Sequence, residues 1–447
     1  MRQPETPFIG DRVTRRCWQE SAALLAIIAV AAFGCSEKSP VPAKGGGERR
    51  PFAATTCDTP TVVECAPDGT SLGALPAQAV KANGSPIRVG MINQETGPAG
   101  AFPELSLADR AAVRFINDEL GGVDGRPIEF SVCDTKFSPE ASTACAQQFV
   151  QQGVVAVAGG IDVFGNGIAI LEQNNIPYVG GIPLSFASAQ SPVSFQFSGG
   201  SWGAVAAFVH YAVETKGAKK ISIMYGEFGS ITDAAKLGEQ LGQKLGAEVK
   251  LVPFPIVTQD LLTPLTAAND GNPDAIVALT ADTGCVPVFK SAHDLGVRAL
   301  LFFTGACASP NILSAAGEAS VDGRYFNVEG LIPEEPDPDS TLYTFIIDKY
   351  GDGLDAASAA TVSFRAMMDL YLQMKAIGGD KISAQRLIEG FRAARDAPNF
   401  MGHPYTCDGK QVPRLPSLCA PQQVIALRRD GRLVSATGWI DVPEILK

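Results

Sequence analysis

Short apolar runs alternate with amphipathic stretches from Ile87 onward. The runs in the first part of this region are Ile87 to Ile92, Ile128 to Val132, Val154 to Ala158, Ile176 to Val179 and Phe195 to Phe197. Between the first two, Leu105, Ala108 and Ala112 recur with helical spacing. Ser138 and Pro139 have the residue types that start a helix. This alternation predicts parallel strands wrapped by helices.

A second series of the same kind follows the first. Its strand patterns are Lys220 to Tyr225, Val249 to Phe254, Ala275 to Leu279, Ala299 to Phe303 and Tyr325 to Val328. After the acidic, Pro-rich turn Pro333 to Pro338 come three helical patterns, Tyr343 to Tyr350, Ala356 to Ile377 and Ser383 to Ala394, and one strand pattern, Val424 to Leu427. These late segments are too few for a third domain. The predicted fold class is therefore α/β, with two doubly wound, Rossmann-like parallel-sheet lobes that the late segments complete.

The N-terminus has the pattern of an export signal. Arg12, Arg15 and Arg16 precede an uncharged run from Ala22 to Phe33, which is too short for a membrane span of about 20 residues. Residues 1–34 are predicted to be a signal peptide. The end of this segment resembles the lipobox of bacterial lipoproteins, which implies that Cys35 is lipidated. Residues 35–84 are then a lipid-anchored tether and N-terminal extension, beginning with the Pro/Gly/Lys-rich stretch Ser36 to Arg50.

Charge and motifs exclude several functions. With 36 Lys and Arg against 47 Asp and Glu, the net charge is −11, so the chain lacks the basic surface that nucleic-acid binding needs. His210, His293 and His403 are far apart and suggest no metal site. No phosphate-binding P-loop occurs, nor a G-x-G-x-x-G after the first strand, and we expect no cofactor.

Eight cysteines remain when Cys17 and Cys35 are set aside, an even number in a chain predicted to be exported. An oxidising compartment favours disulfides. We expect nearest neighbours to pair, namely Cys57 with Cys65, Cys133 with Cys145, Cys285 with Cys307, and Cys407 with Cys419. Buried free thiols are the alternative.

Residues 85–447 resemble the solute-binding proteins of branched-chain-amino-acid-type ABC transporters, the type I periplasmic binding proteins. The resemblance rests on the order of several short segments: Ile87-Arg88-Val89-Gly90 with Thr96-Gly97-Pro98, Ile116-Asn117-Asp118-Glu119-Leu120-Gly121-Gly122-Val123, Asp134, Ala156-Val157-Ala158-Gly159-Gly160, Ile176-Pro177, Asn272-Pro273-Asp274-Ala275, Asp294-Leu295-Gly296 and Asp430-Gly431-Arg432-Leu433. It implies two lobes joined by a three-crossover hinge, which close over a small solute and present it to permease subunits.

The same resemblance sets the expected domains, partners and location. Lobe 1 is predicted over residues 85–200 and 330–398, and lobe 2 over residues 201–329 and 399–447. The expected partners are a small-molecule solute and ABC permease subunits in the membrane. The protein is expected to be an extracytoplasmic monomer, periplasmic or anchored to the cell membrane, and not an enzyme.

Ligand-binding candidates are the residues that follow the predicted strands, because ligands sit beyond the carboxyl ends of parallel strands. They are Thr96, Gly97, Asp162, Val163, Phe164, Ser185, Phe228, Asp282, Thr283 and Thr304. The resemblance implies that Asp162 and Val163 lie near the ligand carboxylate and that Phe228 forms an aromatic wall. It also implies an acidic partner for a ligand ammonium near Thr304; none is there, and Asp282 is the substitute. An amino acid, an amide, urea or an aromatic acid all remain open as ligand.

These residues also have plainer interpretations. The threonines can cap turns, the aspartates can be solvated or cap helices, and the phenylalanines can belong to the core. A secreted serine hydrolase is a less favoured alternative, since Gly199-Gly200-Ser201-Trp202-Gly203 fits G-x-S-x-G, and Asp369 and His403 follow Ser201 in the order of a hydrolase triad. A ligand-sensing receptor component of the same fold is the other alternative, which the sequence does not separate from a transporter.

Overall fold

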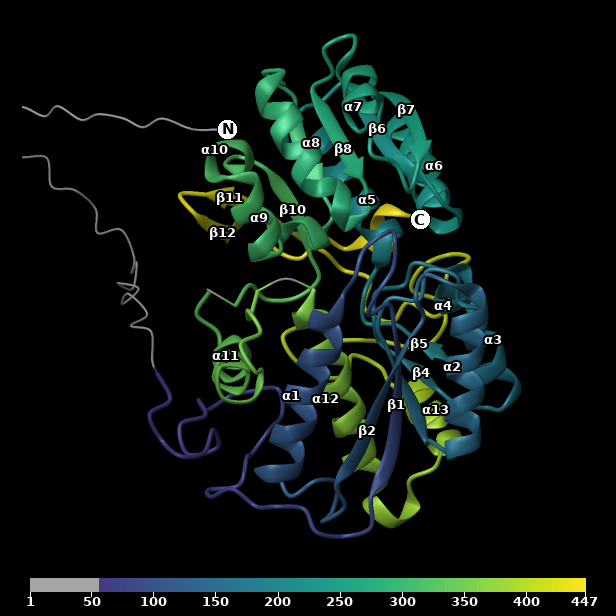
Figure 1. Cartoon of the computed structure of the whole chain (residues 1–447), viewed down its shortest axis with the longest axis vertical. Helices are drawn as coiled ribbons and strands as arrows, with labels where there is room; N and C mark the ends of the chain where they lie inside the picture. Colours follow the sequence, from purple (N-terminus) through teal and green to yellow (C-terminus); the bar gives the residue numbers. More distant parts are fainter. Residues whose placement is uncertain (1–55, 334, 358) are drawn as a thin grey trace, which may run out of the picture. The chain divides into compact units, whose positions relative to one another are not determined.

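The protein is an α/β fold with two parallel-sheet lobes, as the sequence predicted (Figure 1). The structure is a computed structural model that describes residues 56–333, 335–357 and 359–447. All the described residues belong to one compact unit. The predicted signal peptide and Cys35 lie outside the described residues.

The first lobe is built on a five-stranded parallel sheet with the order β2-β1-β3-β4-β5. Its strands are β1 (Ile87–Asn93), β2 (Ile128–Asp134), β3 (Ala156–Gly159), β4 (Tyr178–Val179) and β5 (Ser194–Phe195). Successive side chains point to opposite faces of a strand. In β1, Val89 and Met91 therefore enter the core on one face, whereas Ile92 enters the core on the other. Both faces are covered, which explains the continuous apolar run.

Helices from distant parts of the sequence cover the two faces of this sheet. They are α1 (Pro103–Asp118), α2 (Pro139–Gln152), α3 (Asn166–Gln173), α4 (Phe186–Gln190), α11 (Pro338–Tyr350), α12 (Ala360–Ile377) and α13 (Ala384–Ala393). Helices α1, α11, α12 and α13 pack on one face, and α2 and α3 on the other. Helix α2 begins as predicted, because Ser138 Oγ accepts a hydrogen bond from the Ala141 N–H at 3.2 Å and Pro139 follows it.

The second lobe has a seven-stranded sheet with the order β12-β11-β10-β9-β8-β6-β7. Its strands are β6 (Lys220–Glu227), β7 (Glu248–Pro255), β8 (Ala275–Leu279), β9 (Leu300–Phe303), β10 (Tyr325–Val328), β11 (Val424–Arg429) and β12 (Arg432–Ser435). Strands β6 to β10 are parallel, whereas β11 and β12 pair antiparallel. The sequence pattern predicted only one late strand. Strand β12 follows a tight turn at Asp430 and Gly431, both with positive φ.

Helices also cover both faces of the second sheet. They are α5 (Gly200–His210), α6 (Gly229–Lys244), α7 (Leu262–Asn269), α8 (Asp282–Asp294), α9 (Pro310–Ala316), α10 (Glu318–Val321) and α14 (Val442–Ile445). Helices α5, α6 and α14 share one core, and α7 to α9 share the other. Across the described part of the chain, no helix combines the length and the apolar character that a bilayer span requires.

The chain passes between the lobes three times, after β5, after β10 and before β11. Arg365 on α12 joins two of these passages. It is fully buried and donates hydrogen bonds to the carbonyl oxygens of Phe197, at 3.0 Å, and Glu329. Gln423, in the third passage, donates to Glu329 Oε1 at 3.2 Å. All three passages are therefore tied together by side-chain hydrogen bonds.

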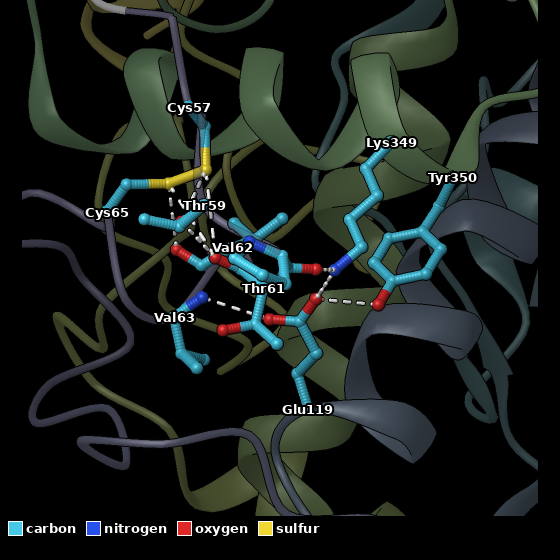
Figure 2. The surroundings of a disulfide bond; sticks show 10 residues. Cys57, Thr59, Thr61, Val62, Val63, Cys65, Glu119, Lys349 and Tyr350 are labelled. Atoms are coloured by element: carbon cyan, nitrogen blue, oxygen red, sulfur yellow. Dashed lines mark hydrogen bonds and ion pairs between the residues drawn. A yellow bond between two sulfur atoms is a disulfide. The ribbon is translucent and has the colours of Figure 1, made fainter.

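The segment before the first strand folds against the first lobe (Figure 2). Val62 and Val63 are buried in its core. Glu119, only 1% exposed, accepts hydrogen bonds from the Val63 N–H at 2.9 Å, from Lys349 Nζ at 2.6 Å and from the Tyr350 hydroxyl at 2.6 Å. The N-terminal extension predicted over residues 35–84 thus contains a segment that packs on the first lobe, and no periodic sequence pattern predicted this packing.

The four expected cysteine pairs are all disulfides in the structure. They are Cys57–Cys65, Cys133–Cys145, Cys285–Cys307 and Cys407–Cys419. Their Cα–Cα distances, from 4.5 to 5.7 Å, lie in the range that a disulfide bridges.

The limits of the lobes stay a prediction, but the packing after Pro398 bears on one of them. Phe400, Met401, Tyr405 and the Cys407–Cys419 disulfide belong to the core of the first lobe. Ile425, on β11, belongs to a core of the second. Between them, Val412, Leu415 and Leu418 pack in the core of the second lobe, whereas Cys419 and Ala420 pack in that of the first. We therefore propose that the third passage lies between Cys407 and Ile425 rather than at Asn399.

Candidate functional site

A cavity of about 160 Å³ lies between the two lobes, at the carboxyl ends of both parallel sheets. Gln94 follows β1, and Ile161 and Val163 follow β3. From the other lobe, Phe228 follows β6 and the loop from Thr280 to Asp282 follows β8. The strand order reverses between β1 and β3 in the first sheet and between β6 and β8 in the second. Such a reversal opens a crevice in which ligands bind.

Four of the ten predicted ligand-binding residues line this cavity: Val163, Phe228, Asp282 and Thr304. The six others do not line it: Thr96, Gly97, Asp162, Phe164, Ser185 and Thr283. Whether any of the ten contacts a solute stays a prediction.

Three of the six that do not line the cavity hold local turns. Thr96 Oγ1 donates to Asp134 at 2.6 Å. Ser185 caps α4, since its Oγ accepts from the Ser188 N–H at 3.1 Å. Asp162 accepts from the Ser142 hydroxyl at 2.6 Å and from the Gly165 N–H at 3.1 Å. These three side chains therefore make the local turn and helix-cap contacts that the sequence analysis gave as the alternative to ligand binding.

Three phenylalanine rings meet at one rim of the cavity. Phe164 and Phe137 come from the first lobe, with ring centroids 5.2 Å apart. Phe228 comes from the second lobe, 5.4 Å from Phe164 and 6.2 Å from Phe137. Edge-to-face pairs of this kind stabilise a contact beyond the area they bury. Phe137, which the sequence did not single out, thus packs against Phe228 from the opposite lobe; the role of Phe228 toward a ligand stays a prediction.

The lobes touch at two further points. A Cβ added to Gly100, in the first lobe, would lie only 2.3 Å from Asp282 Oδ1, in the second. The Ser230 hydroxyl, at the start of α6, donates to the carbonyl oxygen of Leu184. The structure is therefore a closed arrangement, with side chains of both lobes in contact around the cavity.

Two buried oxygen atoms at the cavity have no hydrogen-bond partner, namely Gln94 Oε1 and Asp282 Oδ1. Gln94 is 1% exposed, and its Nε2 donates to the Gly100 carbonyl oxygen at 2.9 Å. Gly100 thus contacts both residues, Gln94 in its own lobe and Asp282 in the other. Buried polar atoms normally have partners, so two unpaired acceptors at one place indicate where a donor would bind.

Burial raises the pKa of the carboxyl groups near the cavity. The pKa of Asp282 is raised by burial, against the effect of the Thr283 and Ala101 N–H groups. Burial raises the pKa of Glu104 to about 7, with Asp282 and Glu95 adding repulsion. The pKa of Glu329, which lines the cavity, is also raised by burial. The cavity therefore has an acidic surround.

Gln94 and Glu329 are cavity residues that the sequence analysis missed. Gln94 directly follows β1, so its position was a usable signal, but the analysis favoured Thr96 and Gly97. Glu329 follows β10 and is 7% exposed. Glutamate side chains are mostly exposed, so the sequence gives no sign that Glu329 is buried. Its burial results from the passages between the lobes that surround it.

The residues of the hydrolase alternative do not form a triad. Ser201 lines the cavity. Asp369 Oδ1 accepts from the Phe400 N–H at 3.1 Å, and the His403 ring nitrogen lies 2.9 Å from the Pro404 carbonyl oxygen. Within the described residues, no hydrogen bond joins Ser201 to His403 or His403 to Asp369. The G-x-S-x-G spelling coincides here with the start of α5.

Several solved structures share the fold. A leucine-binding protein from Thermotoga maritima is 18% identical with a TM-score of 0.66, over 79% of this chain and 99% of that chain. A solute-binding protein of an ABC transporter from Rhodopseudomonas palustris, in complex with p-hydroxybenzoic acid, is 20% identical with a TM-score of 0.67, over 80% of this chain and 98% of that chain. A branched-chain amino acid transporter substrate-binding protein from Streptococcus pneumoniae, in complex with isoleucine, is 16% identical with a TM-score of 0.66, over 80% and 100%.

Sequence comparison identifies the family. No curated protein sequence matches the chain. The family described as periplasmic binding protein matches residues 86–414, which is well over half of the chain and contains every described residue that lines the cavity except Leu433. The members of this family are solute-binding proteins, and membership implies an extracytoplasmic location. The chain therefore belongs to the periplasmic binding protein family.

Proposed function

We propose that the protein is the extracytoplasmic solute-binding component of an ABC importer. It captures a small solute in the cavity between its lobes and delivers it to permease subunits in the membrane. The observation that carries the proposal is the placement of the cavity, which lies at the carboxyl ends of two parallel sheets and is closed by contacts from both lobes. Similar solved structures hold isoleucine or p-hydroxybenzoic acid, which supports a small solute.

Closure supports this function physically. Phe228 contacts two rings of the opposite lobe, and Asp282 lies against Gly100. A solute that touches both lobes stabilises the closed state only to the extent that it binds that state better. We infer that Val163, Phe228, Asp282 and Thr304 contact the solute and that Thr96, Asp162 and Ser185 support the loops around it.

A thermal-shift screen of the purified mature chain against amino acids, amides, urea, small carboxylic acids, amines and sugars tests the proposal. A solute that binds only the folded state raises the melting temperature. Small-angle X-ray scattering with the same solute should show a smaller radius of gyration. If no solute class shifts the melting temperature, the importer function is contradicted.

We also propose that Cys35 anchors the protein to the membrane after residues 1–34 are removed, and that the protein is a monomer. Cys35→Ala should move the protein from the membrane fraction to the soluble fraction of lysed cells, while Cys17→Ala, with the same residue change upstream, should not. Equal fractionation of both variants would contradict the anchor. A sensing role remains the alternative, and loss of solute uptake on deletion of the gene would decide for transport.

A further inference from the structure

The charged side chains that line the cavity are acidic, and none of the described ones is basic. Among the described residues that line it, none is a lysine, an arginine or a histidine. Two are acidic, Asp282 and Glu329. Arg365 lies beside Glu329, so Asp282 is the group that would repel a carboxylate, and the repulsion is strong where water is excluded.

The buried polar atoms of the cavity that lack a hydrogen-bond partner are both acceptors. Gln94 Oε1 and Asp282 Oδ1 are buried without partners, and Gly100 contacts both residues. A ligand that satisfies both must donate at least two hydrogen bonds at this place. It would also bridge the lobes, because Gln94 follows β1 and Asp282 starts α8.

Asp282 also lacks a positive partner. No ion pair of the described residues includes it. The carboxyl group of Glu104 lies close enough for Asp282 to act on it electrostatically. A buried charge without a partner is costly, so a cation bound here gains a strong interaction. A metal ion is not the cation that fits, because no described group of three or more His, Cys, Asp or Glu side chains has the arrangement to hold one.

The remainder of the cavity sets the size and character of the ligand. Most lining side chains are apolar, among them Phe102, Ile161, Leu279 and Ile332. A cavity of about 160 Å³ is close to one of roughly 150 Å³ that holds benzene in another protein. The space therefore suits an apolar body about as large as one aromatic ring or a branched five-carbon chain.

We propose that the solute is a small apolar amine whose ammonium group is held by Gln94 and Asp282, and that solutes with a carboxylate are disfavoured. This inference rests on the proposed solute-binding function and narrows it to one class of ligand. Asp282 supplies the charge, and Gln94 supplies a neutral acceptor from the opposite lobe. The ammonium then joins the two lobes directly.

Calorimetric titration of the mature chain with matched pairs of probes tests the inference. Benzylamine is compared with benzoate, and isoamylamine with leucine, which is the same skeleton bearing a carboxylate. We expect each amine to bind at least about 10-fold more tightly than its carboxylate partner, which corresponds to about 1.4 kcal/mol. Tighter binding of benzoate or leucine would overturn the inference while leaving the proposed function intact. If the wider solute screen is also silent, both the inference and the proposed function fail.

Variants separate the role of Asp282 from general effects of charge. Asp282→Asn should weaken amine binding about 10-fold or more. Asp294→Asn is the matched control, because Asp294 is exposed and ends the same helix, α8, that Asp282 begins. It should leave amine affinity unchanged. Equal affinities of the Asp282→Asn variant and the unaltered chain would overturn the assignment. If that variant fails to fold, the amine-to-carboxylate ratio of the unaltered chain decides alone.

Discussion

The two lobes share a strand order but differ in what their cores contain. Within the described chain, the buried charged residues are Asp109, Glu119, Asp162, Glu329, Asp339, Arg365 and Asp369. All of them belong to the first lobe or, for Glu329, to a passage between the lobes. The polar residues buried in the second lobe are uncharged, for example Ser222 and Asn327.

This difference follows from how each lobe is assembled. The second lobe is mostly one continuous run of the chain, completed by a C-terminal hairpin, and alternating apolar residues are enough to pack it. The first lobe must hold segments far apart in sequence. Asp339 accepts hydrogen bonds from the N–H groups of Ser71, at 2.8 Å, and Met401, at 3.1 Å. Buried charges here serve as attachment points for such segments.

The largest effect is expected at Arg365. Arg365→Met leaves the carbonyl oxygens of Phe197 and Glu329 without their donor and leaves Asp369 and Glu329 without a nearby cation. Breaking a buried charged network typically costs about 3 to 5 kcal/mol of unfolding free energy. Urea unfolding followed by circular dichroism measures it.

The matched change in the second lobe is Arg324→Met. Arg324 is half-buried and donates to the Ser320 carbonyl oxygen at 3.1 Å. We expect it to lower the unfolding free energy by about 1 kcal/mol. Similar losses for the two variants would remove the contrast between the lobes.

Disulfide removal should affect both lobes almost equally. The Cys133–Cys145 and Cys285–Cys307 bridges span 12 and 22 residues. Chain entropy gives a loss of about 3 kcal/mol for each pair, and the longer loop costs only about 0.5 kcal/mol more. Double Cys→Ala variants compared by thermal unfolding test this. A much larger loss in the first lobe would mean that its bridge does more than close a loop.

The docked N-terminal segment gives a smaller effect. Glu119→Gln removes the charge that Lys349 Nζ, the Tyr350 hydroxyl and the Val63 N–H share. Hydrogen bonds to charged groups contribute about 1.5 to 3 kcal/mol, so we expect a loss of about 2 kcal/mol. Glu318→Gln, which breaks a partly exposed ion pair with Arg428 in the second lobe, should cost less than about 1 kcal/mol. Hydrogen exchange should also show faster exchange at residues 61–65 only in the Glu119 variant.

One effect on stability depends on pH and disappears in acid. Burial raises the pKa of Glu104 from 4.5 to about 7. The folded state therefore binds this proton more tightly than the unfolded state, so the stability it contributes is complete below pH 4.5 and is lost as the pH rises to about 7. Glu104→Gln should be more stable than the unaltered chain by about 3 kcal/mol at pH 8 and about equal to it at pH 4. Thermal unfolding at both values measures this, and a gain that is the same at both would contradict the assignment.

The sequence predicted the fold well where apolar runs were long. Strands β1, β6 and β8 coincide with their predicted runs to within a few residues, because side chains on both faces of each are buried. Strands β4 and β5 are two residues long, shorter than the runs that predicted them. The sequence pattern did not predict strand β12, because Arg432 and Ser435 at its two ends are polar and exposed. The docking of Val62 and Val63 depends on partners more than 50 residues away, which no local pattern contains.

The site was predicted at the level of loops rather than of side chains. Ligands bind beyond parallel strands, and this rule found Val163, Phe228, Asp282 and Thr304. It could not separate side chains that face the cavity from those that cap a turn, such as Ser185. Phe137 was missed because its position at the rim depends on a backbone with positive φ in a loop.

The hydrogen bonds of Arg365 determine where the molecule can pivot. Since the carbonyl groups of Phe197 and Glu329 are fixed to α12, the first lobe and the ends of two passages turn as one rigid piece. We expect a rotation of the second lobe to change torsion angles beyond these anchors, where Gly199, Gly200 and Gly330 lie, and in the third passage near Gln423. A Cβ at Gly330 would lie 2.7 Å from the Met401 carbonyl oxygen and 2.8 Å from the Arg365 guanidinium. A side chain at Gly330 would therefore push apart the same groups that hold the passages to the first lobe, which ties the packing of this glycine to the opening of the cavity.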